Sequence, residues 1–155
     1  MKKQTGSIGG CNRRIRLINY KSVALYEITE GYGVDIETIE DPLELLCTPR
    51  TVEFEEKPGS DELQGDYMSG EITGSLPRVS ESMSKQLAAL ASKRWIVLVE
   101  PLTGGCKVFG TPDYPMRFSY SPSVSSDYKT NLYEISLEGD YPEEARFLGT
   151  LTRIQ

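Results

Sequence analysis

The feature that most constrains the fold is how little of the chain has helical periodicity. Only one segment, about Ser80 to Arg94, spaces its apolar residues for an amphipathic helix, at Val79, Met83, Leu87 and Leu90. The first residue of the segment is a serine, which is expected to cap the helix, and a lysine and an arginine suit its negative end. We therefore predict one helix in a chain whose remaining elements are strands.

The rest of the chain alternates apolar and polar residues in short runs, which is typical of half-buried strands. The run WIVLV, Trp95 to Val99, is apolar at every position and is predicted to be a central strand buried on both faces. The segment between Asp41 and Pro49 is expected to be a helical turn or a loop. The pattern predicts a mainly β (α+β) fold, an antiparallel β-sandwich or barrel of about eight strands with one flanking helix.

The chain has 155 residues, a length that fits one domain with a single core. Residues 1–12 are polar and rich in glycine, and we expect a flexible N-terminal arm there, followed by a single β-rich domain over 13–155. The start, MKKQTGSIGGC, lacks the apolar run of a signal peptide, and no segment has the ~18 apolar residues of a membrane span. These features predict a protein that is cytoplasmic at synthesis and has no membrane partner.

The net charge of −6 disfavours nucleic acid as a direct ligand, because phosphate contacts need clustered lysine and arginine. Carboxylates gather in three groups, and each is expected to be a solvated face. A strand face lined by carboxylates would also suit a channel that must not hold DNA tightly, since like charges repel. The groups are Glu53, Glu55 and Glu56; Asp61, Glu62 and Asp66; and Asp140, Glu143 and Glu144.

No catalytic, cofactor-binding or metal-binding constellation is recognisable. Histidine is absent, which removes Ser-His and Cys-His pairs and histidine metal sites, and the three cysteines form no CxxC. Cys106 is interpreted as a structural thiol, with Lys107 expected to point to the opposite face. The match of Ser82 to Lys85 with S-x-x-K is attributed to chance. We predict a protein without enzymatic activity, cofactor or metal.

A long hairpin is predicted from two strand patterns joined by the polar segment Pro58–Gly65. One apolar face would run along both strands, with Gly70 and Gly74 in the second strand allowing another backbone to approach closely or a bulge to form. The members of this face are Val52, Phe54, Met68, Ile72 and Leu76.

The order of these features resembles the structural proteins of bacteriophage and prophage tails, in particular tail-tube-like proteins. The resemblance runs from about Cys11 to Phe147, through GGCNRRIRLINY, the hairpin TVEFEEK…YMSGEITGSLP, the helix SESMSKQLAALASKR, the strand WIVLVEPLTGGCKVFG and YEISLEGDYPEEARFL. It implies a non-enzymatic subunit that self-assembles into rings, with six copies in proteins of this type, stacked into a tube whose lumen carries DNA. The partners would be the protein itself and other tail proteins, and the location would be the virion tail.

Under this resemblance the apolar face of the hairpin becomes the candidate assembly surface. Residues 1–12, Pro58–Gly65 and Ser121–Thr130 are expected to become ordered on contact with neighbours. Two alternatives stay open: a tail terminator or completion protein, which forms one ring and stops, and a carbohydrate- or surface-binding β-sandwich. The latter would use an exposed aromatic face, for which the candidates are Tyr114, Tyr120, Tyr128 and Tyr133.

Overall fold

The computed structural model describes residues 11–63, 65–127 and 130–154, and the predicted arm at 1–10 lies outside these residues. The described chain is mainly β with one α-helix, which confirms the predicted fold class. It has eleven strands rather than about eight, all connected in one sheet. In chain order the elements are β1 (Cys11–Asn19), η2 (Tyr20–Ser22), β2 (Val23–Ile28), β3 (Gly33–Thr38), β4 (Leu43–Leu46), β5 (Glu53–Asp61), β6 (Gly65–Pro77), α1 (Glu81–Ala91), β7 (Arg94–Pro101), β8 (Lys107–Phe109), β9 (Met116–Val124), β10 (Asn131–Tyr141) and β11 (Arg146–Arg153).

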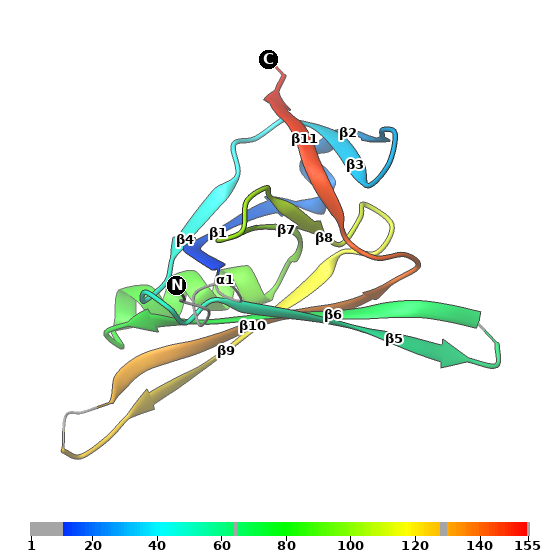
Figure 1. Cartoon of the computed structure of the whole chain (residues 1–155). Helices are drawn as coiled ribbons and strands as arrows, with labels where there is room; N and C mark the ends of the chain where they lie inside the picture. Colours follow the sequence, from blue (N-terminus) through cyan, green and yellow to red (C-terminus); the bar gives the residue numbers. More distant parts are fainter. Residues whose placement is uncertain (1–10, 64, 128–129, 155) are drawn as a thin grey trace, which may run out of the picture.

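The sheet folds over itself into two layers. Strands β5, β6, β10 and β9 form a broad lower layer, and the other strands lie above it (Figure 1). The layers are joined where β7 meets β9, through only two residue pairs, Arg94 with Arg117 and Trp95 with Met116. The layered β-rich architecture agrees with the predicted antiparallel sandwich, except that β11 runs parallel to β3.

Strand β7 is the centre of the fold, as its uniformly apolar sequence predicts. Trp95, Val97 and Val99 face the larger core, which fills the space between the layers together with Leu87 and Leu90 of α1. The alternate residues of β7, Ile96 and Leu98, face a smaller core covered by β3 and β11. Both faces of the strand are therefore closed to solvent, which a run without polar residues requires.

The helix is shorter than predicted, spanning Glu81–Ala91 instead of Ser80 to Arg94. Ser80 is the predicted N-cap, and its side chain accepts a hydrogen bond from the Met83 amide at 3.1 Å. The helix ends early because β7 begins at Arg94, and the Leu90 carbonyl at its end accepts hydrogen bonds from the Lys93 amide at 3.2 Å and the Trp95 indole at 2.9 Å. Figure 1 shows α1 lying on the inner side of the lower layer.

Two further boundaries differ from the prediction. Cys11 and Asn12 begin β1, so the domain starts two residues before residue 13. The segment expected to be a turn or loop contains β4, which pairs with β1 through Leu43 to Leu46. Such short strands form by joining a neighbour that is distant in sequence, and local periodicity over four residues cannot identify that neighbour.

Two hairpins extend beyond the layers in opposite directions, β5–β6 at one end of the sheet and β9–β10 at the other (Figure 1). The β5–β6 ladder continues to the pair of Asp61 with Gly65, so most of the predicted loop Pro58–Gly65 is strand. The β9–β10 ladder continues to Val124, so the predicted loop Ser121–Thr130 also begins in a strand. Among the described residues, no helix is long and apolar enough to cross a membrane.

Candidate functional site

The lower layer presents one largely polar surface, which we call the outer face. Ile72 and Leu76 of β6 are buried, so the intervening residues of β6 and their cross-strand partners point away from the core. Among these side chains are six carboxylates and two cations, which leaves an excess of negative charge, with Arg94 of β7 at the margin. The charged members are Glu53, Glu55, Lys57, Glu71, Arg117, Glu134, Glu138 and Asp140.

Both cations of the outer face are already engaged. Lys57 pairs with Glu55 at 2.9 Å, and Arg117 pairs with Glu138 at 2.8 Å. The other four carboxylates form no ion pair with any residue that the structure describes. The negative potential of the face is therefore little compensated, and the face should repel polyanions.

The candidate assembly surface predicted from the sequence lies on the opposite face of the hairpin, and this face packs against the chain's own core. Val52, Ile72 and Leu76 have exposed fractions of 2%, 0% and 3%, and they belong to the chain's own larger core. Phe54 and Met68 are partly buried and pack against the same core. Alternation in sequence identifies an apolar face but not whether the chain itself covers it.

Neither edge of the lower layer is paired with a described strand along its whole length, although α1 contacts β9. Strand β5 pairs only with β6 among the described strands. On the other side, β9 meets β7 only through Met116 and Arg117, so no described strand pairs with that edge of β9 from Phe118 onward. Unpaired strand edges present free backbone donors and acceptors, which can bind another strand.

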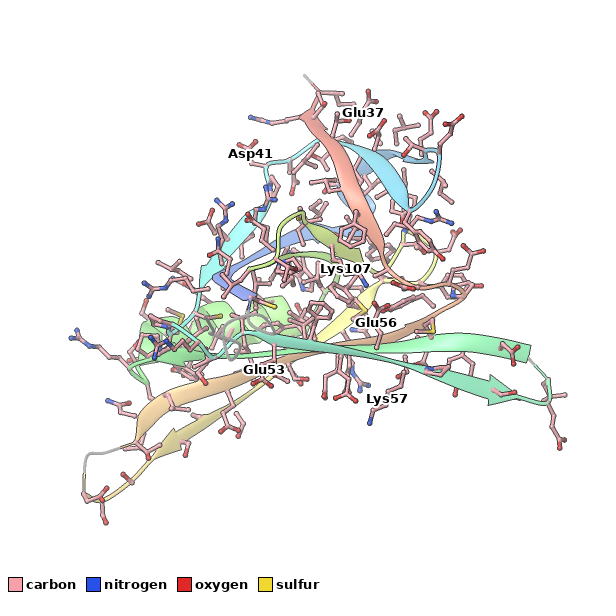
Figure 2. The ribbon with its side chains drawn as sticks, viewed as in Figure 1. Glu37, Asp41, Glu53, Glu56, Lys57 and Lys107 are labelled. Atoms are coloured by element: carbon pink, nitrogen blue, oxygen red, sulfur yellow. The ribbon has the colours of Figure 1, made fainter. Side chains whose placement is uncertain are left out.

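A buried charge cluster lies where β5 leaves the core. The Lys107 ammonium of β8 contacts the Glu56 carboxylate at 2.6 Å and Glu144 at 3.3 Å, and the side chains of Lys107 and Glu56 are 9% and 7% exposed. The other Glu56 oxygen accepts hydrogen bonds from the Tyr141 hydroxyl and, at 2.9 Å, from the Ala145 amide. Figure 2 shows Glu56 and Lys107 between the layers, whereas Lys57 projects from the outward side.

Three phenylalanine rings surround the charged groups of this cluster. The rings of Phe54, Phe109 and Phe147 have their centroids 5.4 to 5.9 Å from the Lys107 ammonium. Burial raises the pKa of Glu56, but the hydrogen bonds from Lys107, Tyr141 and Ala145 and the charge of Lys107 outweigh it, so the pKa lies below its usual value. The ion pair therefore holds β5 against β8, and the hydrogen bond from Tyr141 holds it against β10.

Sequence reasoning missed this cluster, because it placed Glu56 with Glu53 and Glu55 on a solvated face. A signal was available: Glu56 is two residues after Phe54 and so takes the inward position of the strand. A charge at an inward position requires a partner. Nothing local identifies that partner as Lys107, which is 51 residues away.

Cys106 and the Ser82 to Lys85 motif, the other residues considered for chemistry, contact neighbours that do not activate them. The side chains of Cys106 and Lys107 have different neighbours. The Cys106 sulfur lies 3.5 Å from the Arg16 guanidinium, whereas Lys107 is paired with Glu56. Burial raises the pKa of the Cys106 thiol, against the lowering by Arg16, so the thiolate is not favoured. Lys85 pairs with Glu81 on the exposed side of α1, beside the exposed Ser82. Among the described residues, no group of three acidic, cysteine or histidine side chains could hold a metal ion.

The three candidates for an aromatic face that the structure describes do not come together on one exposed surface. Tyr133 is fully buried and its hydroxyl bonds to Ser80 at the start of α1, while Tyr120 packs on the core. Tyr114 lies at a cleft of about 370 Å³ together with Arg146, whose guanidinium is engaged by a glutamate and a backbone carbonyl. Tyr128 lies outside the described residues.

In comparisons with known proteins, no family model, no curated protein and no solved structure matches this chain. A function therefore has to be inferred from the surfaces of the chain itself.

Proposed function

We propose that this protein is a non-enzymatic structural subunit of a phage or prophage tail, which self-assembles into tail-tube-like rings. The observation that carries the proposal is the lower layer, a four-stranded sheet with an acidic outer face and two unpaired edges. A sheet of this kind can continue from one copy to the next while its polar face lines a common space. The partners are other copies of the chain and other tail proteins, and the protein reaches the virion after synthesis in the cytoplasm.

The strand directions fit a closed ring. Each neighbouring pair in the order β9-β10-β6-β5 is antiparallel, so β5 and β9 run in opposite directions. When β5 of one copy lies beside β9 of the next, the antiparallel alternation continues without interruption. The two edges are different surfaces, and contacts between unlike surfaces close into a ring when the rotation between copies is a fraction of a full turn.

Prolines limit where these edges can pair. Pro58 in β5 and Pro122 in β9 each lack the backbone N–H of a ladder. This leaves Glu53–Lys57 of β5 and Phe118–Ser121 of β9 as the segments that pair in the ring. The resemblance of the sequence to tail proteins implies six copies around it.

The acidic outer face fits the lumen of such a ring. Duplex DNA carries a dense line of phosphate charge, and it slides through a channel only if the wall does not bind it. The outer face repels phosphate because four of its carboxylates form no ion pair within the described part of the chain. A tail terminator would share this ring but would not stack, and a sugar-binding module would need neither the open edges nor the acidic face.

The first test is light scattering on a size-exclusion column over a wide concentration range, with negative-stain images of large species. We expect rings, or tubes of stacked rings, with a mass that rises with concentration. One subunit at every concentration, and no rings in the images, would contradict the proposal. A glycan array on the same samples tests the sugar-binding alternative.

Engineered disulfides then test the edges, in a background with Cys106→Ser. Cysteines at Glu53 or Glu55 of β5 are combined with cysteines at Ser119 or Ser121 of β9. We expect at least one combination to give, on oxidation, a ladder of covalent oligomers that stops at the size of the ring. The matched control is Thr73→Cys with Ser119→Cys, because Thr73 lies on an inner strand of the same face. A ladder in the control as well would show random cross-linking.

A further inference from the structure

The two ends of strand β6 carry opposite charge. At the turn between β5 and β6 lie Asp61, Glu62 and Asp66, all exposed, which we call the acidic tip. Asp61 accepts a hydrogen bond from the Leu63 amide within the turn, and none of the three carboxylates has a cationic partner among the described residues. Leu63, between them, is 95% exposed.

At the opposite end of β6 lie Arg50 and Arg78, which we call the arginine end. Arg78 directly follows β6, and its amide donates to the Asn131 carbonyl at 3.0 Å. Arg50 lies in the turn before β5, which is fastened to Ser75 of β6 by the Thr48 amide at 2.8 Å. Both arginines are exposed, and neither guanidinium forms an ion pair or hydrogen bond with a described residue. The nearby carboxylate of Glu81 is already paired with Lys85.

The backbone at both arginines is unusual. Arg50 and Arg78 have φ of 67° and 64°, and among the described residues they are the only ones other than glycine with positive φ. Glycine adopts this conformation without the clash of a Cβ atom, so any other residue at these positions is unfavourable for the isolated chain. Retaining two strained arginines at one end is consistent with a requirement for their side chains there.

The two ends cannot neutralise each other within one copy. Strand β6 has 13 residues, and at about 3.3 Å for each residue it separates the ends by roughly 40 Å. The Debye length at ordinary salt concentrations is about 10 Å. The charges can therefore be matched only by a second molecule.

We propose that copies of this chain associate head to tail, with the acidic tip of one copy on the arginine end of the next. The contact deepens the proposed function and rests on it: open edges join copies side by side in a ring, and oppositely charged ends join one ring to the next. Three carboxylates meet two guanidiniums with five donors each, and Leu63 is buried in the same contact. The contact sets one polarity along the stack, because only unlike ends attract.

The test is charge reversal with exchange. One variant carries Arg50→Glu and Arg78→Glu, and a second carries Asp61→Lys, Glu62→Lys and Asp66→Lys. The control variant, Glu27→Lys with Glu40→Lys, reverses exposed carboxylates on the upper layer. Ring formation and stacking are scored separately, by light scattering and negative-stain images, at low and high salt.

Each reversed variant is expected to form rings and to lose stacking, because like charges then face each other. In an equal mixture of the two variants, every tip again meets an end of opposite sign, so stacks of alternating rings are expected to return. The control should stack as the wild type does, and high salt should weaken the wild-type stacks. The inference would be overturned if wild-type rings do not stack, if the reversed variants stack normally, or if mixing the variants does not restore stacking. None of these outcomes would contradict ring formation itself. Absence of rings in every sample would instead overturn the proposed function.

Discussion

At the scale of single residues, Glu56 shows how position decides the role of a carboxylate. Its neighbours Glu53 and Glu55 are exposed on the outer face, whereas Glu56 points inward and meets Lys107, Tyr141 and Ala145. Two charges removed from water are favourable only when each finds its partner, and this pair is well satisfied. The pair is therefore expected to hold the hairpin in one orientation on the core.

We expect Glu56→Gln to lower the free energy of unfolding at pH 7 by about 3 kcal/mol, since Lys107 loses its main partner. Because the pKa of Glu56 is lowered in the folded protein, its contribution is complete above the usual value of 4.5 and is lost as the pH falls through the folded-state pKa. The difference between wild type and variant should be constant near neutral pH and shrink in acid. Denaturant titrations at a series of pH values measure it.

The matched control is Glu55→Gln on the outer face, whose partner is the exposed Lys57. This variant should change the free energy of unfolding by less than about 1 kcal/mol, as exposed pairs do. Equal losses from Glu55→Gln and Glu56→Gln, or a Glu56→Gln loss that stays the same in acid, would contradict the assigned role.

At the scale of elements, the glycines of β6 fit the strand to its neighbours. A Cβ atom at Gly70 would overlap the Tyr141 hydroxyl, and one at Gly74 would lie 3.0 Å from the Cys47 sulfur. The prediction that another backbone approaches these glycines, or that a bulge forms, is wrong: the register of β6 is regular, and the approaching groups are side chains of the core. Because Tyr141 also donates to Glu56, Gly70 gives the buried charge cluster the space that it needs.

Gly70→Ala is expected to lower the free energy of unfolding by about 1 to 3 kcal/mol, because the added methyl group overpacks the site. The loss should be smaller in a Tyr141→Phe background, where the overlapping hydroxyl is gone, although the ring carbons remain near. A double-mutant cycle from denaturant curves measures this coupling. Gly74→Ala in the same background is the control and should be additive. An additive result for Gly70 would show that the tyrosine hydroxyl is not what the glycine accommodates.

At the scale of the whole molecule, the distribution of charge matters more than its total. The net charge of −6 says that DNA is an unfavourable ligand, but only the fold collects carboxylates on the outer face of one layer. Reversing part of this face should convert a surface that repels DNA into one that binds it. Reversing the same number of charges elsewhere should not.

The variant with Glu53→Lys, Glu71→Lys and Glu134→Lys is therefore expected to bind duplex DNA of random sequence, with an affinity that falls as salt rises. The control with Glu27→Lys, Glu30→Lys and Glu40→Lys has the same net charge, and its changes lie away from the outer face. Electrophoretic mobility shifts at two salt concentrations compare the two variants. Equal binding by both would mean that total charge decides, and it would remove the support that the outer face lends to a lumen.

The fold class was largely predictable, because it depends on local patterns. Alternation with period two identifies strands, the apolar run Trp95 to Val99 identifies the central strand, and Ser80 marks the start of the helix. The helix end and strand β4 were not predictable, since pairing of β7 with β9 and of β4 with β1 decides them. The parallel pairing of β11 with β3 likewise joins segments more than 100 residues apart.

By itself, therefore, the sequence determined that this protein is mainly β with one capped helix and an acidic surface. Tertiary structure alone decided which face of the β5–β6 hairpin the chain covers, that Glu56 meets Lys107, and that opposite charges gather at opposite ends of β6. The physical reason is the difference in sequence separation between local patterns and tertiary contacts. A strand pattern separates two faces within a few residues, but what each face meets depends on segments that chain folding brings together.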